Sequence, residues 1–161
     1  MFLKDAEVFT LIETIGSHFR ANIQNHFTER MLSAVPLDAD TRNLIAELTE
    51  RADSYRSVGY HPDDLYRQIL ALARFISQIR QDILPHIRTL SPASSSCIDQ
   101  ADRIRRDMAI SNFGPNLKIL SDMLGELYLK TVAFDRQASG KNPPVYTKHP
   151  ALLELGRYLV A

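Results

Sequence analysis

The sequence predicts an all-α protein, an antiparallel bundle of four to five long helices with a short C-terminal helix docked on it. Apolar residues recur at helical spacing in nearly every segment, and no alternating strand pattern competes with them. Most prolines and glycines fall between these segments, where helices end and begin. With 161 residues, 45% of them hydrophobic, a single domain spanning residues 1–161 can bury a sizeable core.

The first expected helix covers about residues 2–34, and Pro36 ends it. Its stripe recurs at spacings of three, four or seven and contains Phe2, Phe9, Ile12, Phe19, Ile23 and Phe27. The second helix follows a cap at Asp38 or Asp40. Its buried face contains Leu44, Leu48, Ala52 and Tyr55, before Val58-Gly59-Tyr60-His61 breaks the helix.

The third expected helix opens at Pro62, with Asp63 and Asp64 in its first turn. It has the clearest pattern, a heptad seam of Leu65, Ile69, Leu72, Ile76, Ile79, Ile83, His86 and Leu90. Such a seam favours packing at a shallow angle of about 20°. Arg67 and Arg74 fall on the opposite face, and Pro85 predicts a kink or an early end.

Two more helices complete the prediction. Ser91-Pro92 opens the fourth, whose inner stripe contains Cys97, Ala101, Ile104 and Met108. Phe113-Gly114-Pro115 predicts a hard break before the fifth, whose stripe contains Leu117, Leu120, Leu124, Leu127, Thr131 and Phe134. Gly140 is the expected stop. Residues 141–149 are expected to form an irregular connector, and residues 150–160 a latch helix.

The latch is too apolar to lie free in water, so we expect it to dock on its own bundle or on another molecule. Leu152, Leu155 and Leu159 share one face of this helix. Tyr146 in the connector is a further candidate contact. It belongs to Pro143-Pro144-Val145-Tyr146, which matches the peptide that WW domains bind but is also typical of a stiff connector. The sequence leaves docking in cis and in trans open.

Two histidines lie on apolar stripes with a carboxylate on the same helix. Glu29 follows His26 by three residues, and Asp82 precedes His86 by four. If successive helices alternate in direction, the first and third are parallel, and both histidines lie at comparable height. The four side chains could then bind zinc, manganese or iron. Core histidines bonded to carboxylates explain the same pattern, so we expect no cofactor. The other two histidines considered, His18 and His61, are expected on the surface.

Charge and motifs narrow the classes of function. The 19 basic and 19 acidic residues balance, which argues against direct binding of nucleic acid. No apolar run is long enough to span a bilayer, and Asp5 and Glu7 stand where a secretory signal needs apolar residues. One cysteine excludes an internal disulfide, and no phosphate loop or nucleophile motif occurs. We therefore expect a cytoplasmic protein with no membrane partner and no enzymatic activity.

The favoured function is an interaction or scaffold protein that binds itself, as a homodimer, or another helical protein. Apolar residues beside the main stripes widen them enough to need contacts on two sides, namely Val8, Leu11, Ile15, Leu70, Phe75, Leu84 and Ile87. The alternatives are a metal-binding protein or enzyme centred on His26, Glu29, Asp82 and His86, and a regulator that reaches nucleic-acid machinery through protein partners.

Overall fold

The structure, a computed structural model, describes residues 2–24, 37–79 and 100–139, with side chains excepted in 100–113 and 138–139. This part of the chain contains four α-helices and no β-strand. The elements are α1 (Ala6–Phe19), a π-helical turn (Arg20–Gln24), α3 (Ala39–Thr49), a 3-10 turn (Ala52–Tyr55), α4 (Pro62–Gln78) and α6 (Gln100–Ser139). The all-helical prediction is confirmed for these residues, whereas a bundle of four to five long helices is not.

The chain enters α1 later than the sequence suggested. Asp5 caps the helix by accepting a hydrogen bond from the backbone N–H of Glu7 at 2.8 Å. The residues before it are extended, and Leu3 exchanges two backbone hydrogen bonds of 2.8 and 3.0 Å with Tyr60. The prediction that the first helix starts at about residue 2 is therefore wrong, because the first residues pair with the segment that precedes α4, and its predicted end near residue 34 lies outside the described residues.

The starts of α3 and α4 follow the sequence signals. Asp38 accepts a hydrogen bond from the backbone N–H of Thr41 at 2.7 Å, and this contact with Thr41 lowers the pKa of the Asp38 carboxyl. Pro62 occupies the first turn of α4, and His61 caps that helix by accepting from the N–H of Asp63 at 3.2 Å. His61 is exposed, as expected, but its ring also fixes where α4 begins.

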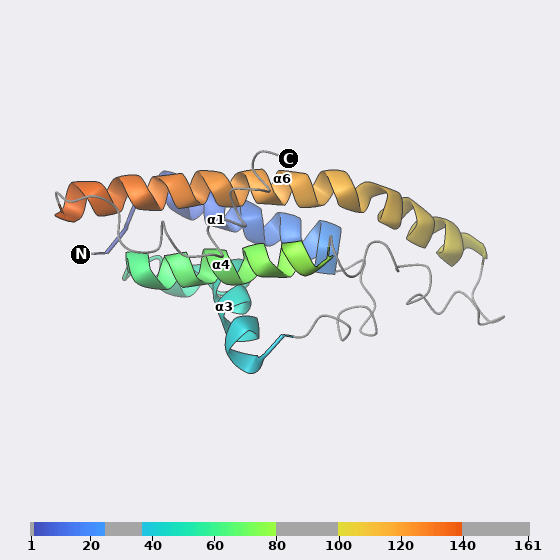
Figure 1. Cartoon of the computed structure of the whole chain (residues 1–161), viewed down its shortest axis with the longest axis horizontal. Coiled ribbons are helices and arrows are strands. Elements are labelled where there is room, and N and C mark those ends of the chain that lie inside the picture. Colours follow the sequence, from blue (N-terminus) through green and yellow to red (C-terminus); the bar gives the residue numbers. More distant parts are fainter. Residues whose placement is uncertain (1, 25–36, 80–99, 140–161) are drawn as a thin grey trace.

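The predicted break at Phe113-Gly114-Pro115 is wrong, because α6 runs through it as one helix of 40 residues. A helix stop would put Gly114 in the left-handed region, but Gly59 is the only residue with positive φ among those described. Pro115 removes one helical hydrogen bond and crowds the preceding turn. In Figure 1 the first part of α6 bends away from the line of the rest, as a proline inside a helix can produce.

The four helices pack in a closed cycle, in which each helix contacts two others. Helix α1 contacts α3 and α6, and α4 contacts the same two helices from the other side. Helix α6 runs along the length of the molecule in Figure 1, while α3 lies obliquely to the others. Two aromatic contacts show that α1 and α4 run in the same direction. Near the start of both helices the Phe9 ring lies 5.9 Å from that of Tyr60, and near their ends the Phe19 ring lies 5.7 Å from that of Phe75. This is the relation that the sequence predicted for the first and third helices.

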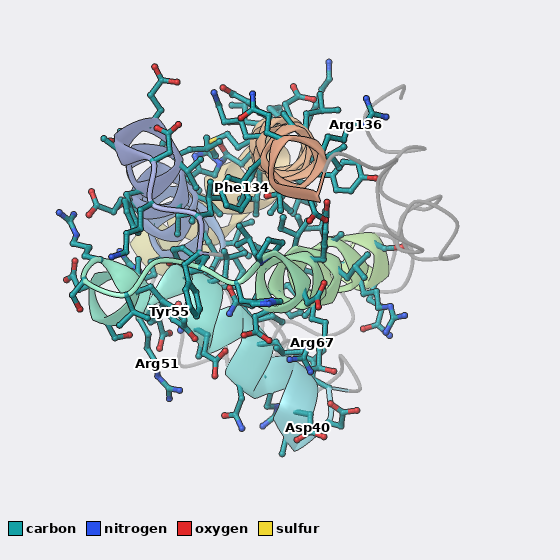
Figure 2. All side chains as sticks on the ribbon, turned by 90° about the vertical axis from the view of Figure 1, so that its left-hand side faces the viewer. Asp40, Arg51, Tyr55, Arg67, Phe134 and Arg136 are labelled. Carbon is teal, nitrogen blue, oxygen red and sulfur yellow. The ribbon has the colours of Figure 1, made fainter. Side chains whose placement is uncertain are left out.

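Helix α4 is buried on nearly all sides and forms the centre of the core. The predicted seam from Leu65 to Ile79 is confirmed, since all five of its described residues are at most 1% exposed. Arg67 and Arg74 are exposed, as expected. In Figure 2 Phe134 of α6 lies toward the interior, whereas Arg136 lies at the periphery.

The apolar residues beside the main stripes are covered within the chain wherever the structure describes them, whereas Leu84 and Ile87 lie outside the described residues. Val8 and Ile15 of α1 and Leu70 and Phe75 of α4 all belong to the buried core, at 7% exposure or less. Leu11 is half-buried and packs against it. The width of these stripes is thus explained by contacts of α1 and α4 with their neighbours in the cycle. For these described residues it is no longer an argument for a second copy of the chain.

Candidate functional site

A groove of about 460 Å³ opens on the surface between α1 and α6. Its lining comes from two helices that contact each other along their length (Figures 1 and 2). The residues that line it are Ala6, Glu7, Thr10, Leu11 and Thr14 of α1 and Glu126 and Lys130 of α6. We refer to it below as the α1–α6 groove.

The α1 side of the groove follows from helical spacing. Positions 7, 10, 11 and 14 share one face of a helix, and the neighbouring face carries the buried stripe of Val8, Ile12, Ile15 and Phe19. The hydroxyls of Thr10 and Thr14 donate to the carbonyls of Ala6 and Thr10, at 3.0 and 2.9 Å. Because the helix itself takes up these hydroxyl hydrogens, α1 offers mainly small apolar surface to anything that lies in the groove.

Three of the lining residues are charged, namely Glu7 on α1 and Glu126 and Lys130 on α6. Glu126 and Lys130 are four residues apart and so share a face, and the Lys130 ammonium lies 3.4 Å from the Glu7 carboxylate across the groove. Two large apolar side chains of α6, Ile119 and Leu129, are exposed but do not belong to the groove lining. They are 47% and 63% exposed. The groove therefore combines small and apolar side chains of α1 with an ion pair that crosses from α1 to α6.

His18 fixes the far end of the same helix pair, contrary to the prediction that it is a surface residue. It is half-buried, and its Nε2 lies 3.1 Å from the carbonyl oxygen of Asn116 in α6. A carbonyl only accepts, so Nε2 carries the hydrogen, and Nδ1 then accepts from the Asn22 amide at 3.2 Å. With Lys130 beside Glu7, this contact shows that α1 and α6 are antiparallel.

A second polar cluster joins α3 to α4 beneath the 3-10 turn. The Glu47 carboxylate accepts from the Tyr55 hydroxyl at 3.2 Å and from the amide of the fully buried Gln68 at 3.1 Å. The Tyr55 ring stacks on Tyr60, with 4.5 Å between centroids. Burial, reinforced by Glu47, raises the pKa of Tyr55, and burial likewise raises that of Tyr60. These phenols stay protonated at neutral pH, so the cluster acts through hydrogen bonding and packing.

The residues that the sequence singled out lie outside the described part of the chain. This holds for the four candidate metal ligands His26, Glu29, Asp82 and His86. It also holds for the docking candidates Tyr146, Leu152, Leu155 and Leu159, and for Cys97. Among the residues that are described, no three or more histidine, cysteine, aspartate or glutamate side chains come together as metal ligands would.

The α1–α6 groove is thus a feature that sequence reasoning missed. In the sequence, the groove is indicated only by Thr10 and Thr14 beside Leu11, a pattern that an ordinary solvated helix face also shows.

Comparisons of the chain with protein-family profiles, curated proteins and solved structures give no match. In the part that the structure describes, no helix combines the length and apolar character needed to cross a membrane.

Proposed function

We propose that the chain is a non-enzymatic interaction module that binds an amphipathic helix of a partner protein in the α1–α6 groove. The observation that carries the proposal is the groove itself, an open hollow between two antiparallel helices whose lining combines Ala6, Thr10, Leu11 and Thr14 with the ion pair of Glu7 and Lys130. Proteins that recognise helices use such a surface, into which the partner lays residues spaced three and four apart.

The shape of the groove favours a helix over a small molecule. Sites for small molecules enclose most of the ligand surface. Here Glu7, Thr10 and Thr14 are exposed, so the groove is an open channel along α1. Its volume of about 460 Å³ accommodates several side chains of a third helix. A second copy of the chain is one candidate for that partner, and the cytoplasm remains the expected setting.

In the test, the wild-type chain and two variants are each immobilised, and the proteins that each retains from a cell extract are compared. In Thr10→Arg/Thr14→Arg, two long charged side chains fill the groove from exposed positions of α1. Asn43→Arg, at an exposed position of α3, adds the same kind of side chain elsewhere. Proteins retained from an extract of the source cell by the wild type and by Asn43→Arg should be lost with the groove variant. Retention of the same proteins by all three would contradict the proposal.

Metal analysis separates the proposal from its main alternative. We expect purified full chain to hold no stoichiometric transition metal. One equivalent of zinc, manganese or iron that is lost in His26→Ala and in His86→Ala would favour the metal-binding function instead.

A further inference from the structure

We propose that His61 is a pH-dependent cap of α4. In its neutral form the ring holds the first turn of the helix, and in its protonated form it releases that turn and pairs with the Asp63 carboxylate. The inference concerns the place where the chain enters α4, and it does not depend on the proposed function of the α1–α6 groove.

The hydrogen bonding at the start of α4 depends on one ring nitrogen. Pro62 has no N–H, so Asp63 provides the first backbone donor of the helix, and His61 Nδ1 accepts from it at 3.2 Å. Helices are usually capped by the oxygens of Ser, Thr, Asp or Asn, which accept hydrogen bonds at neutral and mildly acidic pH. An imidazole accepts only through an unprotonated nitrogen, and imidazoles take up a proton between about pH 8 and pH 5. Mild acid therefore removes the cap of α4.

A carboxylate lies next to the cap. The Asp63 Oδ2 atom is 3.8 Å from the same Nδ1. When Nδ1 gains a proton, it and the Asp63 N–H become two donors that face each other, so the ring turns toward the carboxylate. The positive end of the helix dipole also disfavours a cation in the capping position. The Asp63 N–H is then left to water, which reaches it because the contact is exposed.

Charged groups from neighbouring elements also lie near this end of α4. They are Lys4 of the N-terminal segment beside Gly59, Asp53 and Arg56 beside Tyr60, and Asp135 of α6 beside Tyr66. Asp53 and Arg56 pair with each other, and Asp64 pairs with Arg67. Among the described residues, only the Asp63 carboxylate lies at ion-pair distance from His61.

The His61 ring also contacts the N-terminal segment. The Phe2 ring lies edge-on to it, with 6.0 Å between centroids, while Leu3 pairs with Tyr60 through two backbone hydrogen bonds. A turn of the imidazole changes the ring contact but leaves the backbone pair in place. Phe2 therefore reports the state of His61, and Leu3 serves as an internal reference.

The experiment follows the full chain by NMR between about pH 8 and pH 5, with amide exchange rates divided by those of an unstructured peptide. As the His61 ring takes up its proton, exchange of the Asp63 amide should become about fivefold faster, the usual effect of losing a cap. The Asp63 carboxyl carbon and the Phe2 ring should shift over the same pH interval. Exchange of the Leu3 amide and of the interior of α4 should stay unchanged. An Asp63 amide or carboxyl group that does not respond to protonation of His61 would overturn the inference.

His61→Asn is the matched variant, because asparagine caps helices and does not titrate. Its Asp63 amide should stay protected over the whole pH range, whereas in His61→Ala this amide should exchange fast at both ends of the range. If His61→Asn shows the same pH dependence as the wild type, another group such as His18 causes the effect and the inference fails. The titration of the wild type decides by itself if the variants do not fold.

Discussion

Gly16 of α1 lies against the backbone of Thr49 at the end of α3, so closely that a Cβ on Gly16 would overlap the Thr49 carbonyl oxygen. The guanidinium of Arg20, one turn further along, donates to the same carbonyl. The last turn of α3 is thereby satisfied by a cation from α1, as its unpaired carbonyls and negative dipole end require. This crossing holds α3 on the side of α1 that faces away from the α1–α6 groove.

Gly16→Ala should destabilise the protein by about 1–3 kcal/mol, because the new methyl group meets backbone that cannot rotate away. Gly114→Ala is the matched control, since a Cβ there meets nothing within 4 Å outside its two chain neighbours and the backbone of its own helix. At this position the higher helix propensity of alanine is opposed by Pro115, which restricts the residue before it, so the change should alter stability by less than about 1 kcal/mol. Urea denaturation measures both. A neutral or stabilising Gly16→Ala would show that the two helices can separate without cost.

The seam of α4 supplies a second prediction. Ile76 and Ile79 are at most 1% exposed, so replacement of either by alanine should cost about 2–5 kcal/mol. Arg74→Ala, on the exposed face of the same helix, should change the free energy of unfolding by less than about 0.5 kcal/mol. Thermal or urea denaturation compares the three variants. A larger effect of the arginine change would mean that the buried face of α4 is wrongly assigned.

The parts of the fold that sequence predicts are those governed by local periodicity. The Asp38 cap, the Pro62 start and the Leu65–Ile79 seam depend on residues within a few turns of one another. The prediction of a break at Pro115 failed because a proline removes one helical hydrogen bond without forbidding a helix, and α6 bends there instead of ending.

The candidate site could not be predicted in the same way. From the sequence alone His18 is predicted to be a surface residue, because its partner Asn116 is 98 positions away and lies beside it only in the folded chain. The α1–α6 groove likewise forms where the polar faces of two helices meet. Periodicity shows which face of each helix is buried, but not which exposed faces lie next to each other.

The buried tyrosines make stability fall at high pH. Burial raises the pKa of Tyr60, and burial together with nearby Asp135 raises that of Tyr66. The folded chain therefore keeps phenolic protons that the unfolded chain releases above a pH of about 10. The stabilisation is complete below that pH, and the free energy of unfolding then falls by about 1.4 kcal/mol per pH unit for each such tyrosine.

Tyr60→Phe removes one of these contributions. The Tyr60 hydroxyl is buried and has no hydrogen-bond partner among the described residues, so the change should leave stability at pH 8 equal or slightly higher. At pH 11 the variant should gain about a further 1.4 kcal/mol relative to the wild type. Urea denaturation at the two pH values gives this difference. If the difference is the same at both, the phenol ionises as readily in the folded as in the unfolded chain.

The leucines of segment 150–160 supply the last prediction, which concerns stability rather than site. Replacement of Leu152, Leu155 and Leu159 by serine should lower the melting temperature by several degrees if the segment is docked. Each buried leucine contributes about 1.5–3 kcal/mol, from which the entropy of ordering residues 140–149 is deducted. Glu154→Ser with Arg157→Ser, on the opposite side of the same helical pattern, should leave the melting temperature unchanged.

Light scattering on the same proteins decides whether the contact is made within one chain. Docking in cis predicts the same molar mass for the wild type and for the leucine variant, with only the melting temperature lowered. A dimer that becomes a monomer when the leucines are replaced would show that the segment docks on a second copy. If melting temperature and mass are both unaffected, the leucines stabilise no docked state, and the segment is available as a peptide for a partner to bind.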